Sequence, residues 1–177
     1  MDEEPSDGAV IRGIFERENQ RLNLGQVDKE EYIMGKCYNK IEIKAPVNKV
    51  WDTIRDFHDL SWAPDVVPSV GKVGDKIGNE IGAKRILNGV FHETLTELDP
   101  GRFSFAYSID DGPGPVASDA VSNYTGRVKV TASDMGCMVE WSSTFESENE
   151  NEVADFCNPI YMALLNALNE TLSEQAS

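Results

Sequence analysis

The alternation of apolar and polar residues in five successive segments between residues 81 and 145 constrains the fold more than any other feature. Side chains of a β-strand point alternately to opposite faces, so each segment predicts a strand with one face toward a core. The side chains expected inward are Ile81, Ala83, Arg85 and Leu87; Phe91, Glu93 and Leu95; Phe103, Phe105, Tyr107 and Ile109; Tyr124, Val128 and Val130; and Cys137, Val139, Trp141, Ser143 and Phe145. These segments follow one another as the strands of an antiparallel meander.

A long amphipathic helix is predicted after the last strand, from about residue 149 to residue 173. Its apolar stripe comprises Val153, Phe156, Ile160, Leu164, Leu165, Leu168 and Leu172. Pro159 falls inside this pattern, and we expect it either to kink the helix or to mark its true start.

The residues before the alternating segments predict a strand, a helix and an irregular stretch. Residues 37–44 alternate as a strand, and Pro46 opens a helix that buries Val50, Trp51 and Ile54. Residues 58–64 predict a short second helix or a turn, and residues 68–78 predict short, irregular strands. This order predicts an α+β domain whose curved antiparallel sheet wraps the C-terminal helix and leaves a cavity between the two.

We expect two regions, an N-terminal extension over residues 1–35 and the folded domain over residues 36–177. Within the extension, Val10, Ile11, Ile14 and Phe15 have the spacing of a short amphipathic helix. The chain starts without the basic and apolar regions of a signal peptide.

Charge and cysteine content limit the expected binding partners and the expected cellular compartment of the protein. The formal net charge is −15 and the pI is about 4.4, which argues against nucleic acid and anionic membrane surfaces as partners. Cys37, Cys137 and Cys157 form no CxxC pair, so we expect a reduced, cytoplasmic protein. The oligomeric state does not follow from the sequence.

Four polar residues fall on predicted inward faces that are otherwise apolar: Arg85, Glu93, Tyr107 and Tyr124. An inward charge must be paired or sit in a wet cavity, because burying it alone is costly. A cation, a carboxylate and two phenols that converge inside a curved sheet therefore indicate a ligand-binding or reaction site.

Several motifs together resemble the SRPBCC (START-like) superfamily and its polyketide cyclase/dehydrase-like members. They are Ile41-Glu42-Ile43-Lys44-Ala45-Pro46-Val47 with Val50-Trp51, Gly82-Ala83-Lys84-Arg85, Glu93 with Leu95, Leu98 and Asp99, Tyr107-Ser108-Ile109, Pro115-Val116, and Asn123-Tyr124. The resemblance covers about residues 37–172 and implies a helix-grip fold. The subgroup is similar to lachrymatory-factor synthase, which rearranges a small sulfenic acid by proton transfer. The loop of residues 117–122 and the N-terminal extension depart from that pattern.

The resemblance implies that Arg85, Glu93, Tyr107 and Tyr124 are the catalytic residues. Glu93 is the natural general acid or base, while Arg85 and the two tyrosines suit stabilisation of an oxyanion. Direct pairing of Arg85 with Glu93 would decide how reactive the carboxyl is. Further residues expected to line the ligand site are Trp62, Phe91, Phe105, Trp141 and Tyr161. No cofactor and no metal are expected, because no cluster of ligating side chains has the right spacing.

Alternative functions stay open on the sequence alone. The leading hypothesis is a cofactor-free cyclase, isomerase or lyase acting on a small hydrophobic or amphipathic molecule. The alternative is a non-catalytic carrier or sensor in which Arg85 anchors a polar head. A buried Arg85–Glu93 ion pair with a purely structural role, and a protein that binds partners through its N-terminal extension, are two further alternatives.

Overall fold

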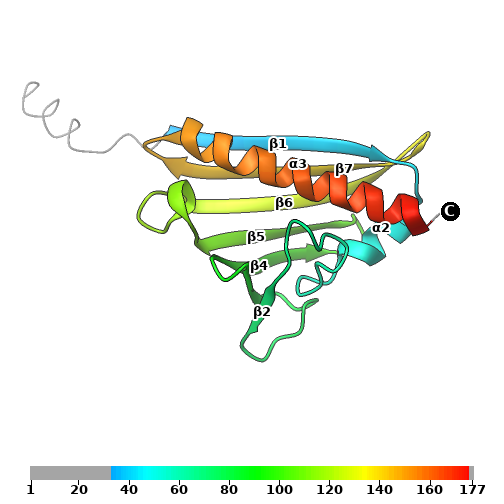
Figure 1. The fold of residues 1–177 in the computed structure, drawn as a ribbon, viewed down its shortest axis with the longest axis horizontal. Helices are drawn as coiled ribbons and strands as arrows, with labels where there is room; N and C mark the ends of the chain where they lie inside the picture. The colour runs from blue at the N-terminus through cyan, green and yellow to red at the C-terminus, as the bar shows by residue number, and fades with distance from the viewer. Residues whose placement is uncertain (1–32, 176–177) are drawn as a thin grey trace, which may run out of the picture. The chain divides into compact units, whose positions relative to one another are not determined.

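The computed structural model describes residues 33–175, and in this part of the chain seven strands form one antiparallel sheet. Their order across the sheet is β1-β7-β6-β5-β4-β3-β2 (Figure 1). The strands are β1 (Ile33–Ile43), β2 (Val70–Val73), β3 (Lys84–Leu87), β4 (Phe91–Asp99), β5 (Ser104–Asp111), β6 (Ser122–Ser133) and β7 (Gly136–Ser147). From β3 onward, neighbours in the sheet are neighbours in the sequence, which confirms the predicted meander.

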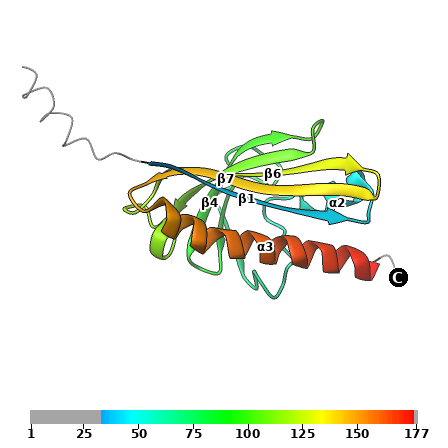
Figure 2. The ribbon, with the colours of Figure 1, turned by 90° about the horizontal axis from the view of Figure 1, so that it is seen from above.

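The C-terminal helix α3 (Glu150–Gln175) runs along one face of this sheet (Figure 2). The residues that it buries are Val153, Cys157, Tyr161, Leu164, Leu165, Leu168 and Leu172. They recur every three or four positions, so they form a single stripe that faces the sheet. This arrangement confirms the predicted helix-grip fold. The helix continues through Pro159, which therefore does not mark its start.

Helix α2 (Val47–Ile54) follows β1 and begins directly after Pro46, whose backbone is extended. It buries Val50, Trp51 and Ile54 against the core, as the spacing predicted. The chain then turns at Phe57, whose amide donates to the carbonyl of Gly78 at 2.9 Å. Residues 58–64 form turns, which resolves the alternative between a helix and a turn.

Two residues expected inward lie elsewhere, because their strands start later than the alternation suggested. Ile81 is 57% exposed in the turn that precedes β3. Phe103 precedes β5 with a left-handed φ of 52° and is only half-buried, with its ring edge-on to Trp51. Strand alternation does not apply in either place, so the inward assignment was wrong for both residues.

The predicted extension falls largely on residues 1–32, which lie outside the described residues, and β1 begins at Ile33. Among the helices of the described part, none is both long and apolar enough to cross a membrane.

The grip of the sheet on α3 can be tested with one helix residue. Leu165 is fully buried, and Leu165→Ala should lower the free energy of unfolding by about 2–5 kcal/mol, because a cavity replaces the side chain. The neighbouring exposed residue gives the control, Asn166→Ala, which should change little. Urea denaturation of both variants measures the difference, and equal stability would contradict the packing described.

Candidate functional site

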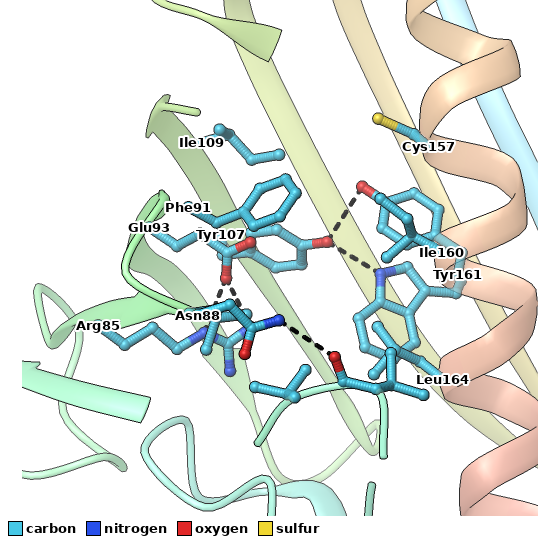
Figure 3. Close-up of a pocket in the computed structure, with 14 residues that line it drawn as sticks. Arg85, Asn88, Phe91, Glu93, Tyr107, Ile109, Cys157, Ile160, Tyr161 and Leu164 are labelled. Atoms are coloured by element: carbon cyan, nitrogen blue, oxygen red, sulfur yellow. Dashed lines mark hydrogen bonds and ion pairs between the residues drawn. The ribbon is translucent and has the colours of Figure 1, made fainter. Parts of the chain in front are cut away.

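A cavity of about 140 Å³ lies between the sheet and α3 (Figure 3). Its lining residues are Val66, Val67, Arg85, Leu87, Asn88, Phe91, Glu93, Tyr107, Ile109, Trp141, Cys157, Ile160, Tyr161 and Leu164. Most of this lining is apolar. Among its polar groups, Arg85 and Glu93 lie on the sheet, and the Tyr161 hydroxyl lies on the helix across from them.

Arg85 and Glu93 are direct cross-strand partners in the β3–β4 hairpin. The hairpin turns at Asn88 and Gly89, both of which have left-handed backbones. In this register the two side chains point to the same face of the sheet, where both are about 95% buried. The Asn88-Gly89 turn therefore sets the strand register that brings Arg85 and Glu93 together.

The ion pair uses one carboxylate oxygen. Arg85 Nε and Nη2 both lie 2.7 Å from Glu93 Oε2. The guanidinium also donates from Nη1 to the carbonyl of Phe57 at 2.8 Å, and it stacks 3.7 Å above the centre of the Phe57 ring. No described residue donates a hydrogen bond to Glu93 Oε1, so this oxygen is available to a ligand.

The environment of Glu93 acts on its protonation in two opposite directions. Burial disfavours the charged carboxylate and raises the pKa, whereas the charge and hydrogen bonds of Arg85 lower it. Burial is the larger effect, so the pKa of Glu93 lies above its ordinary value. A carboxyl with a raised pKa can both accept and return a proton near neutral pH.

A chain of hydrogen-bonded hydroxyl groups links the sheet to the helix across from Glu93. Trp141 Nε1 donates to Tyr107 Oη at 2.9 Å, and Tyr107 Oη donates to Tyr161 Oη at 3.1 Å. The Tyr124 hydroxyl is hydrogen-bonded to the same Tyr161 hydroxyl. Burial raises the pKa of all three phenols, so they remain neutral donors.

Local packing places these rings. Tyr107 lies opposite Gly126 in the β5–β6 register, and its ring crosses over that glycine. A Cβ at position 126 would lie 2.2 Å from Tyr107 Cζ, so only glycine leaves room. The Trp141 and Tyr161 rings stack with centres 5.4 Å apart, which couples the sheet to the helix.

The structure places the predicted site residues at different distances from the cavity. Arg85, Glu93, Tyr107, Phe91, Trp141 and Tyr161 line it. Tyr124 is not among the lining residues, and its ring stacks on Phe145 with centres 5.5 Å apart. Phe105 packs between Trp51 and Phe57 in the core. Trp62 is buried in the turn after α2, where its Nε1 donates to the Asp59 carbonyl at 3.1 Å.

The cavity lining also includes residues that were not predicted as ligand-binding residues. Cys157 and Leu164 lie one turn on either side of Tyr161, and this i, i+4, i+7 spacing on α3 was a usable signal. Asn88 gave no such signal. Its side-chain Nδ2 donates to the Val66 carbonyl at 3.1 Å, and its backbone N–H donates to the Ser69 carbonyl at 2.9 Å. These bonds hold the segment that contributes Val66 to the cavity.

Neither of the two histidines lines the cavity. His58 lies in the turn after α2, where its Nε2 is 2.9 Å from the Lys84 carbonyl, and His92 is exposed on the opposite side of β4 from Glu93. Within residues 33–175, no three His, Cys, Asp or Glu side chains come together as metal ligands.

A family and several solved structures match the chain. The sequence model of the family described as polyketide cyclase / dehydrase and lipid transport matches residues 34–172. A protein of Nitrosospira multiformis is 40% identical, with a TM-score of 0.75 over 80% of this chain and 99% of that one. XoxI of Bacillus cereus is 24% identical, with a TM-score of 0.67 over 81% and 99% of the two chains.

Norcoclaurine synthase of Thalictrum flavum, solved with dopamine and hydroxybenzaldehyde, shares the fold at 13% identity. Its TM-score is 0.68, over 85% of this chain and 93% of that one. No curated protein matches the chain. The family match confirms the superfamily resemblance drawn from the sequence motifs.

Breaking the buried ion pair should cost more than breaking an exposed one of equal length. Arg85→Met should lower the free energy of unfolding by about 3–5 kcal/mol, because Glu93 is left buried without its partner. Adding Glu93→Leu should recover most of this loss. The control is Arg127→Met, since Arg127 pairs with Glu97 at 2.7 Å on the surface and should contribute less than about 1 kcal/mol. Similar losses for both arginine variants in urea denaturation would contradict the burial of the pair.

Proposed function

Because the chain belongs to the polyketide cyclase / dehydrase and lipid transport family, within the SRPBCC (START-like) superfamily, we propose that it binds a small, mostly apolar molecule in its internal cavity. We further propose that it catalyses a proton transfer on that molecule, such as a cyclisation, an isomerisation or a rearrangement. The observation that carries this proposal is Glu93, a buried carboxyl with a raised pKa and one oxygen open to the cavity.

The volume of the cavity limits the ligand. An engineered protein cavity of about 150 Å³ binds benzene, so a cavity of similar size suits one ring or a short branched chain. The volume of this protein's cavity, about 140 Å³, matches such a molecule better than a polycyclic polyketide. The substrate class is therefore a compact molecule with an apolar body and one polar group, for which the polar walls provide partners.

The proposed reaction needs no group beyond the protein and the substrate. Glu93 Oε1 takes a proton from a substrate carbon next to a carbonyl group. The electron pair of the broken C–H bond then forms the enolate. Glu93 then returns the proton at another atom, so that atoms and charge balance. Arg85 holds the other carboxylate oxygen and keeps Glu93 oriented. A hydroxyl donor on the other side of the cavity stabilises the developing oxyanion.

One observation favours the alternative of a non-catalytic carrier. Arg85 directs two of its three short hydrogen bonds, from Nε and Nη2, at Glu93 Oε2, and such contacts favour the ionised, static form of the carboxyl. In a carrier, the pair would serve only to meet the polar end of the ligand. We also propose that the protein works in the reducing cytoplasm, since its three cysteines are buried and unpaired.

Exchange of protons next to a carbonyl distinguishes the two functions without knowledge of the natural substrate. Cyclopentanone is small enough for the cavity and carries acidic C–H groups. The wild type should accelerate the loss of its α-proton NMR signal in D₂O, and Glu93→Gln should lower that acceleration by about 100-fold or more, because the amide cannot act as a base. Glu97→Gln is the matched control, since Glu97 lies on the same strand but outside the cavity.

The results have separate meanings. Full exchange in Glu97→Gln with loss in Glu93→Gln supports the acid/base role. Binding of cyclopentanone by the wild type without acceleration of exchange would contradict catalysis and leave the carrier function. Equal exchange in wild type and Glu93→Gln would remove Glu93 from the reaction.

A further inference from the structure

The hydroxyl chain opposite Glu93 has a direction that is fixed at one end. An indole N–H only donates, so Tyr107 Oη accepts the bond from Trp141 Nε1 at 2.9 Å. Tyr107 then has a single proton, which it donates to Tyr161 Oη at 3.1 Å. Although the Tyr107 ring lines the cavity, its hydroxyl has no proton left for a ligand.

Tyr124 contacts Tyr161 but does not itself line the cavity. It is absent from the lining residues, and its hydroxyl bonds to that of Tyr161, where either atom can be the donor. When Tyr124 donates, the Tyr161 oxygen accepts two hydrogen bonds and its own proton is free. Tyr161 lines the cavity from α3 and lies across from Glu93 (Figure 3).

We propose that the Tyr161 hydroxyl is the donor that meets the oxygen of a bound ligand. Tyr107, Tyr124 and Trp141 act as positioning residues that direct it. The inference rests on the proposed function, since it assigns a partner to the ligand's polar group. It shifts the oxyanion-stabilising role from the two strand tyrosines of the sequence hypothesis to a tyrosine of the helix.

Two physical effects make this hydroxyl a strong donor. A hydroxyl that accepts hydrogen bonds is polarised by them, so its own O–H donates more strongly. The ring is also held before any ligand arrives, because it is 4% exposed and stacks on Trp141 at an interplanar angle of 19°. A preorganised donor stabilises developing charge without the cost of reorienting during the reaction.

Arg85 is the competing donor for a ligand oxygen, because its guanidinium also lines the cavity. Its Nε, Nη1 and Nη2 atoms already donate to Glu93 and to the Phe57 carbonyl. These bonds and its stacking on the Phe57 ring hold the guanidinium on the side of the cavity across from α3 (Figure 3). The test must therefore separate a ligand oxygen at Tyr161 from one at Arg85.

A pair of isosteric probes provides the test. Cyclopentanone has a carbonyl that only accepts hydrogen bonds, and methylenecyclopentane has the same shape without the oxygen. NMR titration gives the ratio of their affinities for the wild type and for Tyr161→Phe. The affinity for the ketone relative to that for the hydrocarbon should be about fivefold lower in Tyr161→Phe than in the wild type. A factor of this size corresponds to the loss of one neutral hydrogen bond. The affinity for the hydrocarbon itself should stay constant and thereby report an intact cavity.

Matched variants complete the design. Tyr38→Phe removes a tyrosine hydroxyl that is bonded to Glu140 on the surface, and it should leave the ratio unchanged. Tyr124→Phe should lower the ratio by less than Tyr161→Phe does. An unchanged ratio in Tyr161→Phe would overturn this inference alone and assign the oxygen to another donor such as Arg85. Failure of the wild type to bind either probe would instead contradict the proposed ligand-binding function.

Discussion

The buried pair of Arg85 and Glu93 is the interaction on which the rest of the site depends. It joins β3 to β4, and through the Phe57 carbonyl it also ties the turn after α2 to the sheet. Two charges this deeply buried are tolerated only with short, well-aligned hydrogen bonds, so the surrounding elements must keep their positions. The pair therefore fixes one wall of the cavity and leaves Glu93 Oε1 without a hydrogen-bond donor among the described residues.

The second wall depends on the helix as much as on the sheet. Strands β5 and β7 supply Tyr107 and Trp141, while α3 supplies Tyr161, so the hydroxyl chain forms only when the sheet grips the helix. Core packing and the candidate chemistry are thus linked. A change that loosens α3 would separate Glu93 from the hydroxyls across the cavity, even without touching a polar residue.

Strand alternation predicted the inward positions of Arg85, Glu93 and Tyr107 because face parity is a local property of the backbone. It failed where a strand began later, as at Ile81. The pairing of Arg85 with Glu93 followed from the Asn88-Gly89 turn, a signal that the sequence analysis did not use. The Phe57 carbonyl, the bonds of Asn88 and the small volume of the cavity arise from tertiary packing, which periodicity does not encode.

The pKa of Glu93 decides whether this carboxyl can act as an acid or a base. It can be measured by ¹³C NMR titration of the side-chain carboxyl carbon in labelled protein, assigned by comparison with Glu93→Gln. We expect a pKa above the ordinary glutamate value of about 4.3, because burial outweighs the attraction of Arg85. A pKa below that value would show that Arg85 holds the carboxylate permanently ionised, and it would contradict the role of Glu93 as an acid/base group.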